Sequence, residues 1–225
     1  MEKLSILLVI AHPDDEVDVG GTIYKLVREG HRVAVCVMVG RATARRNLSA
    51  RLHSEQSQSM RILGVQKVYT ADFPNIKMNT VPHLDLVQFI ENCIDDFEAD
   101  AIITHHPADV NNDHAMTSLA AQAACRLFQR RENIKRLRLF MYFESACATE
   151  WSLDSSANRF APNLYVEIGQ EGFAKKMEAL EAYSGVKRPY PHPQSVESYE
   201  GLASYRGTQA GMKYAEAFEC VFRSV

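Results

Sequence analysis

Short apolar runs alternate with longer helix-favouring segments along the chain, and this alternation constrains the fold more than any other feature. The apolar runs carry almost no charge, which is typical of strands buried on both faces of a sheet; they span residues 4–10, 33–39, 65–70, 101–104, 137–143 and 164–168. The intervening segments have helical spacing or composition, and they span residues 22–29, 46–63, 84–97, 114–130, 172–183 and 195–205. This order predicts a mostly parallel sheet flanked by helices.

The length of the chain favours a single domain of this kind. A chain of 225 residues can bury a substantial core, and 46% of its residues are hydrophobic. We find no repeat, low-complexity segment or linker in the sequence, because the proline-rich stretch 187–193 is only a short loop. We therefore expect one domain over residues 1–225, with a Rossmann-like α/β fold whose ligands bind at the carboxyl ends of the strands.

Charge and composition argue against several classes of partner. The formal net charge is -3 and basic residues form no long block, so we expect neither nucleic acid nor insertion into a membrane. The apolar run 6–11 is too short to span a bilayer, and it continues into a polar cluster without a cleavage site, which favours a first strand over a signal peptide. The five cysteines are scattered and include no C-x-x-C pair, which favours a reducing cytoplasm.

Two unusual polar clusters follow the first and fourth apolar runs. "HPDDE" occupies residues 12–16, and "THHPADVNNDH" occupies residues 104–114. Because both follow strands of one predicted parallel sheet, their loops can converge at its carboxyl edge. The three adjacent carboxylates of the first cluster repel one another, and burying them unpaired is costly, so we expect a cation beside them.

The residue types in these clusters are those of a hydrolytic zinc site, which needs about three nitrogen or oxygen ligands and an open position for water. His12, Asp15 and His114 supply two imidazoles and a carboxylate. Asp14 then stands beside the site without being needed as a ligand, as a general base requires. The sequence therefore predicts one zinc ion per chain, or another divalent ion in its place. Acidic turns also cap helices, which is the simplest interpretation of Glu16.

Two motifs make the chain resemble the PIG-L/LmbE-like zinc-dependent de-N-acetylases. They are "AHPDDE", followed closely by "GGT", and "HHPADVNNDH" further along. The stretches "ESACATEW", "PNLYVEI", "PHPQS" and "AEAFE" resemble a bacterial subgroup and extend the similarity over most of the chain. The resemblance implies removal of an acetyl group from an N-acetylglucosamine-type sugar in a glycoconjugate or a biosynthetic intermediate. It also implies His12, Asp15 and His114 as zinc ligands and Asp14 as the base.

The chain departs from the family pattern three residues before the last predicted ligand. Some members have a histidine there, thought to polarise the amide carbonyl, whereas this chain has Asn111. An amide donates a hydrogen bond but cannot deliver a proton at neutral pH. We take His192, in the loop "YPHPQS", as the candidate for this catalytic role; a surface-loop histidine is the alternative interpretation. His105 and His106 are further candidates, one near the metal and the other packing against the loop.

Four residues are candidates for substrate binding: Arg51, Asn111, Asp109 and Trp151. The tryptophan could stack on a sugar face or pack in the interior. An arginine group after the second strand would suit a phosphate or hydroxyl-rich ligand, or else forms a solvated helix start; it comprises Arg41, Arg45, Arg46 and Arg51. Asp109, like Asp113, could instead orient a histidine from behind.

Taken as a set, these residues predict an enzyme: a single-domain, metal-dependent N-deacetylase acting on a small amino-sugar substrate. Two alternatives stay open, a metal-dependent hydrolase of a phosphoester or cyclic amide and a non-catalytic carbohydrate-binding protein. Two metals about 3.5–4 Å apart would favour phosphoester chemistry, but the ligand set suffices for one. Loss of a ligand or of Asp14 would favour the non-catalytic class, and all four residues are present. Self-association into a homo-oligomer is left open.

Overall fold

The computed structural model describes residues 3–42, 51–153 and 158–225, and its strands form one sheet in the order β3-β2-β1-β4-β5-β7-β6. Five neighbouring strands are parallel: β3 (Lys67–Thr70), β2 (Arg32–Val37), β1 (Ser5–Ile10), β4 (Ala101–His105) and β5 (Leu139–Phe143). At one edge, β7 (Ala215–Arg223) runs antiparallel to both β5 and β6 (Leu164–Glu167). The predicted mostly parallel sheet is thereby confirmed.

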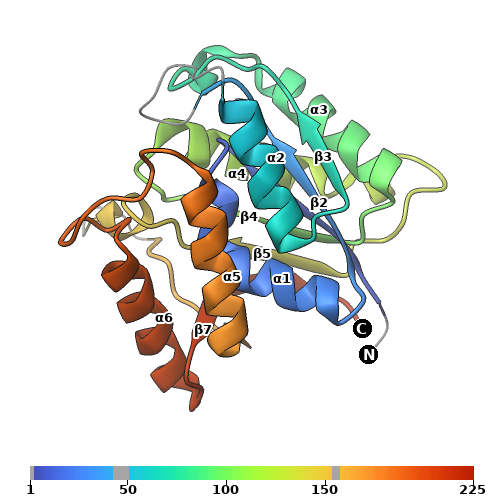
Figure 1. The fold of residues 1–225 in the computed structure, drawn as a ribbon. Coiled ribbons are helices and arrows are strands. Elements are labelled where there is room, and N and C mark those ends of the chain that lie inside the picture. The colour runs from blue at the N-terminus through green and yellow to red at the C-terminus, as the bar shows by residue number, and fades with distance from the viewer. Residues whose placement is uncertain (1–2, 43–50, 154–157) are drawn as a thin grey trace.

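Helices cover both faces of this sheet (Figure 1). One face carries α1 (Gly20–Arg28), α2 (Leu52–Leu63) and α5 (Gly169–Ala182), which pack against one another, and the other carries α3 (His83–Phe97) and α4 (Asn112–Ala124). α6 (Val196–Ala210) packs along β6 and β7. Short 3-10 turns lie between these elements: η1 (Asp15–Val19), η2 (Met78–Thr80), η3 (Leu127–Gln129) and η4 (Thr149–Trp151).

The central strand β1 contributes to both cores, which explains its uninterrupted apolar sequence. Leu7 and Val9 enter the core beneath α3 and α4. Ile6, Leu8 and Ile10 enter the core beneath α1, α2 and α5. Because successive side chains of a strand point to opposite faces, a strand covered on both sides needs apolar residues at every position.

The start of α1 is held in place by close packing and by a buried ion pair. A Cβ atom at Gly21 would lie 2.8 Å from Ile168, so a glycine is required for the approach of these two segments. The carboxylate of Glu216 on β7 accepts the backbone N–H groups of Gly21 and Thr22 at 3.1 and 2.7 Å, which satisfies the helix N-terminus. Lys176 on α5 donates to the same carboxylate at 2.9 Å. The end of the first polar loop is therefore anchored to β7 and α5.

Some predicted boundaries are wrong. The helix predicted over residues 114–130 ends at Ala124, because the chain turns through η3 and buries Leu127 in the core. The helix predicted over 46–63 is described only from Leu52, and residues 43–50 lie outside the described residues. β7 was not predicted, because Glu216 and Glu219 interrupt its apolar pattern.

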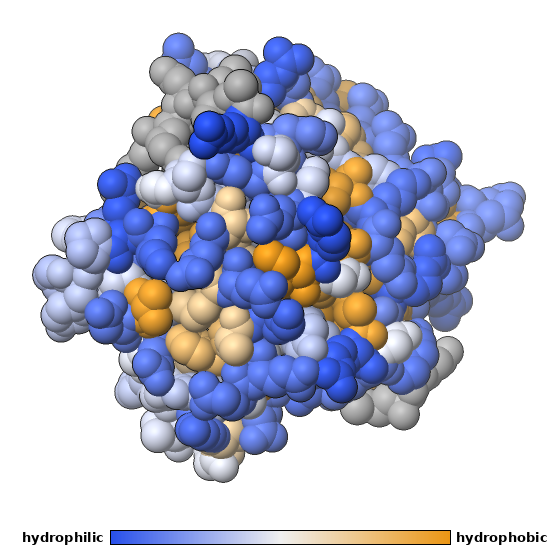
Figure 2. All heavy atoms as spheres, in the orientation of Figure 1, coloured by the Kyte–Doolittle hydropathy of each residue, from blue (hydrophilic) through white to orange (hydrophobic). Residues whose placement is uncertain are grey.

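Hydrophilic side chains cover most of the face that bears α2 and α5, with hydrophobic ones scattered among them (Figure 2). Among the described residues, every helix is too short or too polar to cross a bilayer.

Candidate metal centre and active site

The loops that follow β1 and β4 meet at the carboxyl edge of the sheet, because these two strands are parallel neighbours. The first loop leads through η1 into α1. The second leads from the end of β4 into α4, whose first turn carries Asp113 and His114. The two polar clusters of the sequence are therefore brought together, as their positions after the strands predict.

His12, Asp15 and His114 lie side by side in the buried part of this edge. Nδ1 of His12 and Nε2 of His114 each lie 3.5 Å from a carboxylate oxygen of Asp15. One ligand atom from each of the three residues can be chosen so that all lie within 4.8 Å of one another. The backbone N–H of His12 also donates to Oδ2 of Asp15 at 2.7 Å, which holds that carboxylate against the loop.

A carboxylate stands behind each of these two histidines. Nε2 of His12 lies 3.1 Å from Oδ2 of Asp113, and Nδ1 of His114 lies 3.1 Å from Oδ2 of Asp109. Asp109 is further fixed by the hydroxyl of Thr149, which donates to Oδ2 at 3.0 Å. Metal-ligating histidines ordinarily donate their second nitrogen to such a partner, which sets the tautomer and the orientation of the ring.

The nitrogens left over by this arrangement fit a bound cation. Nδ1 of His12 and Nε2 of His114 are buried and have no hydrogen-bond partner among the described residues, a costly state for polar atoms. Burial disfavours a charge on His114, yet the carboxylates of Asp15 and Asp109 raise its pKa well above the usual value. The same field favours a metal ion, and two imidazoles with one carboxylate are a donor set typical of zinc sites with an open position.

His105 packs against His114, one of the three predicted metal ligands. Its ring stacks on that of His114 with centroids 3.9 Å apart. Its Nε2 accepts the backbone N–H of Ala11 at 3.0 Å, and its Nδ1 lies 3.1 Å from the hydroxyl of Ser145. Burial lowers its pKa to about 4, so the ring is neutral at physiological pH. His105 also belongs to a second group close enough to hold a metal, with Asp109 and His114, but both of its nitrogens already have partners.

His106 turns away from the metal residues. Its ring lies edge-on to those of Tyr142 and Phe160, and its Nε2 lies 3.4 Å from the carboxylate of Glu219. Of the two adjacent histidines, the structure therefore places the first beside the predicted ligands and the second among packing residues.

Asp14 lies in the same cleft as two of the predicted ligands, Asp15 and His114, but is more exposed than they are. It is half-buried and lines a cleft of about 370 Å³ together with Asp15 and His114. Its backbone φ of 94° is in the left-handed region, which is uncommon for a residue other than glycine. Its N–H donates to Oε2 of Glu16 at 3.1 Å, and this contact helps to hold the unusual conformation.

Glu16 has a role that the sequence did not reveal. Its side chain is fully buried, and its Oε1 accepts the hydroxyls of Tyr183 and Ser59 while Oε2 accepts the N–H of Asp14. Burial raises the pKa of this carboxyl. The prediction that it caps α1 is wrong, because Glu216 takes that position. The sequence around Glu16 could not predict these partners, because Ser59 lies on α2 and Tyr183 lies at the end of α5.

Two other predicted residues, His192 and Asn111, also line the cleft. Nδ1 of His192 accepts the backbone N–H of Gln194 at 3.0 Å, so the neutral ring carries its proton on Nε2. Oδ1 of Asn111 accepts the N–H of Asp113 at 2.9 Å and caps α4. Asn111 therefore positions the helix that carries His114 while its side chain borders the cleft.

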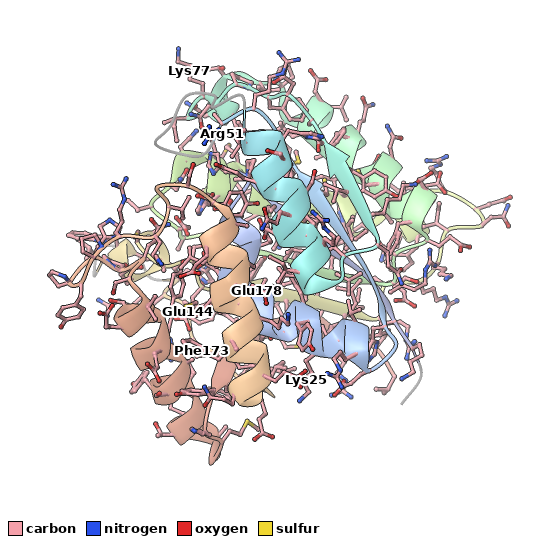
Figure 3. The ribbon with its side chains drawn as sticks, viewed as in Figure 1. Lys25, Arg51, Lys77, Glu144, Phe173 and Glu178 are labelled. Carbon is pink, nitrogen blue, oxygen red and sulfur yellow. The ribbon has the colours of Figure 1, made fainter. Side chains whose placement is uncertain are left out.

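The remaining predicted substrate contacts lie elsewhere in the structure. The side chain of Asp109 is fully buried behind His114, so the prediction that it binds substrate is corrected to an orienting position. Trp151 is 58% exposed and is not among the described residues that line the cleft. Arg51 precedes the first residue of α2 (Figure 3), makes no side-chain capping hydrogen bond and is also outside that lining. Arg41 pairs with Asp72 at 3.1 Å, and Arg45 and Arg46 lie outside the described residues.

A family model described as "PIG-L: GlcNAc-PI de-N-acetylase" matches residues 7–125, more than half of the chain, and this range includes His12, Asp15 and His114. Fold, site and match together define a hydrolytic N-deacetylase. Within that class, the chain belongs to the PIG-L family of de-N-acetylases.

Several known proteins are similar to the chain over most of its length. The uncharacterized deacetylase YaiS of Escherichia coli (strain K12) is 24% identical over 188 residues, covering 81% of this chain and 91% of the relative. The N,N'-diacetylchitobiose deacetylase of Pyrococcus horikoshii has a TM-score of 0.78 at 20% identity, covering 98% of this chain and 84% of that one. The 4-carboxy-2-hydroxymuconate hydratase of Pseudomonas putida KT2440 also scores 0.78, at 21% identity, covering 100% and 98%. These structures establish the fold, which supports more than one chemistry.

Proposed function

We propose that the protein is a zinc-dependent hydrolase that removes the acetyl group from an N-acetylglucosamine-type amino sugar. The observation that carries the proposal is the pair of buried, unpartnered nitrogens, Nδ1 of His12 and Nε2 of His114, on either side of the Asp15 carboxylate. Both nitrogens face the same carboxylate at 3.5 Å, an arrangement that a shared divalent ion would bridge.

His12, Asp15 and His114 hold the ion in this proposal. When bound, a divalent ion supplies a Lewis acid for the amide carbonyl and lowers the pKa of water. Asp14, which lines the cleft, accepts a proton from the attacking water and returns it to the leaving amine. His192 donates a hydrogen bond from Nε2 to the carbonyl oxygen as negative charge develops there. Asp113 and Asp109 keep the two ligating rings in position.

An amino-sugar substrate is supported by the family description and by the cleft. A volume of about 370 Å³ lies within the range of small-ligand sites. Its lining is mixed, with carboxylates, an amide and an imidazole beside apolar residues such as Val110 and Val186, as a sugar with polar edges and an apolar face requires. The described cysteines are free, which supports a reducing compartment such as the cytoplasm.

The proposal is tested by metal analysis combined with a screen for acetate release. Purified protein would be stripped with a chelator, reloaded separately with zinc, iron and magnesium, and assayed on free, glycosidic and phosphorylated N-acetylglucosamine. We expect acetate from at least one of these sugars in the zinc-loaded protein and none in the stripped protein. Release of phosphate instead of acetate, or equal activity with and without metal, would overturn the proposal.

A further inference from the structure

Asp18 is a carboxylate of the cleft that the proposed chemistry does not use. It lines the same cleft as Asp14 and Asp15. The hydroxyl of Tyr199 on α6 donates to its Oδ1 at 3.1 Å. Lys176 donates to the backbone carbonyl of Asp18 at 2.6 Å and to the carboxylate of Glu216, rather than to the Asp18 side chain. No lysine, arginine or histidine of the described part of the chain forms an ion pair with the Asp18 carboxyl.

The surroundings of Asp18 disfavour the ionised form of its carboxyl. Burial raises the pKa of Asp18 to about 8, although the nearby Lys176 acts in the opposite direction. An asparagine or a leucine would avoid this penalty, since neither has a charge to desolvate. Asp18 is only partly buried, whereas two fully buried acids of the site hold backbone groups in place. Glu16 accepts the N–H of Asp14, and Asp113 accepts the N–H of Ile76 at 2.6 Å. Asp18 instead interacts with the Tyr199 hydroxyl and the backbone N–H of Ala146 while its side chain also lines the cleft.

The 3-10 turn η1 places Asp18 beside Asp15 along the cleft. Asp15 and Asp18 are three residues apart in the 3-10 turn η1, and side chains at this spacing in a 3-10 helix eclipse one another. They therefore project from the same side of the turn, separated by a rise of about 6 Å. That separation is comparable to the width of one hexose ring. A sugar whose acetamide reaches Asp15 and Asp14 would bring a ring hydroxyl to Asp18.

We infer that Asp18 is a specificity residue, whose carboxyl binds one hydroxyl of the amino sugar and thereby selects its configuration. This inference rests on the proposed function, because it assumes that the acetamide lies at the His12–Asp15–His114 group. A carboxyl accepts a hydrogen bond from a hydroxyl whether it is ionised or protonated, and in the protonated form it also donates one. The substrate class is therefore a sugar with a free hydroxyl across the ring from its acetamide.

A purely structural role is the competing explanation. Asp18 links η1 to Tyr199, and it borders a void of about 20 Å³ that has room for one water molecule. If this were its only role, replacing Asp18 would weaken activity on every substrate by the same factor. A hydrogen bond to one hydroxyl predicts a loss that depends on whether the substrate carries that hydroxyl.

The test is a cycle between protein variants and substrate analogues. The zinc-loaded full chain would be assayed for acetate release from methyl N-acetylglucosaminide and from its 3-deoxy, 4-deoxy and 6-deoxy analogues. The variants are Asp18→Ala and Asp18→Asn, the second retaining shape if the first folds poorly. Tyr199→Phe is the matched control, since it removes the hydrogen bond from the Tyr199 hydroxyl to Asp18 but leaves the carboxyl in place.

We expect wild-type kcat/KM to fall about 10- to 100-fold on one deoxy analogue, the usual weight of a hydrogen bond to a carboxyl group. Asp18→Ala should lose a similar factor on the parent sugar and nothing further on that analogue. Tyr199→Phe should lose the same factor on all four sugars. An equal loss for Asp18→Ala on all four sugars would assign Asp18 to the structural role and overturn the inference.

Failure of the proposed function gives a different result, because the wild type would then release no acetate from any sugar. In that case the same variants and sugars would be compared by binding affinity instead of by kcat/KM. Calorimetry would measure the affinity of each variant for methyl glucosaminide and its deoxy analogues, which cannot be turned over. If wild type loses affinity for one deoxy analogue only and Asp18→Ala loses nothing further on it, Asp18 binds that hydroxyl. An equal loss of affinity by Asp18→Ala on every sugar, or no binding of any sugar, overturns the inference.

Discussion

Nε2 of His12 lies 3.1 Å from Oδ2 of Asp113, and this same oxygen accepts the backbone N–H of Ile76 at 2.6 Å. Oδ1 of Asp113 accepts the N–H of Met78 at 3.1 Å. One buried carboxylate therefore joins a predicted metal ligand to a loop that follows β3, and Ile76 in that loop lines the cleft with a left-handed φ of 55°. The orientation of His12 and the shape of the cleft wall depend on the same side chain.

Replacing Asp113 should weaken metal binding without removing a ligand. In Asp113→Ala, the ring of His12 loses the partner that fixes its tautomer, and we expect zinc affinity to fall by about 10- to 100-fold. Affinity would be measured by competition with a chromogenic chelator. Asp72→Ala, which removes an exposed carboxylate paired with Arg41, is the control and should bind zinc as the wild type does. Unchanged affinity in Asp113→Ala would show that His12 does not depend on this contact.

Glu16 should affect turnover although it lies outside the cleft lining. In Glu16→Ala, the buried hydroxyls of Tyr183 and Ser59 lose their acceptor, and we expect the free energy of unfolding to fall by about 1–3 kcal/mol. The kcat should fall as well, because the N–H of Asp14 loses its anchor. Tyr183→Phe also removes one hydrogen bond to Glu16 but leaves that anchor, so it should lose stability and keep its kcat. Urea unfolding and acetate release separate the two effects; equal kcat in both variants would refute the role of Glu16.

Cys147 should make the cleft sensitive to thiol reagents. It lines the cleft, and its Sγ lies 4.0 Å from Nδ1 of His192, whereas Cys36 and Cys93 are buried in the core. We expect iodoacetamide to inactivate the enzyme by filling the cleft beside His192. Cys147→Ser should retain its own starting activity under the same treatment, with peptide mass spectrometry locating the adduct. Equal inactivation of Cys147→Ser would place the sensitive thiol elsewhere.

Asp18 should make stability depend on pH in a defined direction. Burial raises its pKa to about 8 in the folded state, against a usual value of 3.8. Between these values, the folded state keeps a proton that the unfolded state releases, so this group lowers the free energy of unfolding as the pH rises. Asp18→Asn removes this contribution to the pH dependence of the free energy of unfolding, because an amide does not titrate in this range. In chelator-treated protein, the Tm of Asp18→Asn should therefore rise relative to wild type from about pH 5 to about pH 8. If the difference in Tm between Asp18→Asn and wild type stayed constant across this pH range, the raised pKa of Asp18 would be contradicted.

The sequence is a good guide to those parts of the fold in which one residue pattern decides the outcome. β1 and β2 have apolar residues on both faces because helices cover both, and this gives the uninterrupted runs that predict them. β7 could not be predicted in this way, because it contains a buried charge. The carboxylate of Glu216 is paired with Lys176, which lies on α5. The end of α4 was also missed, because tertiary packing of Leu127 outweighs a helix-favouring composition.

In the candidate site, too, local sequence predicts some features, whereas others depend on distant segments. Loop position after parallel strands was enough to expect His12, Asp15 and His114 near one another, and the structure places them so, while their binding of a metal stays a prediction. The partners of Glu16 and the buried position of Asp109 could not be predicted, because they depend on which side chains from distant segments arrive at the loop.

Metal content is the measurement that tests the central claim most directly. Wild type, Asp14→Asn and His114→Ala would be purified in parallel, loaded with zinc, passed through a desalting column and analysed by inductively coupled plasma mass spectrometry. The account predicts one zinc ion per chain in wild type and in Asp14→Asn, whose kcat should nevertheless fall by about 10²–10⁴ because the base is lost. It predicts no retained zinc in His114→Ala. Full zinc occupancy in His114→Ala, or loss of zinc in Asp14→Asn, would contradict it.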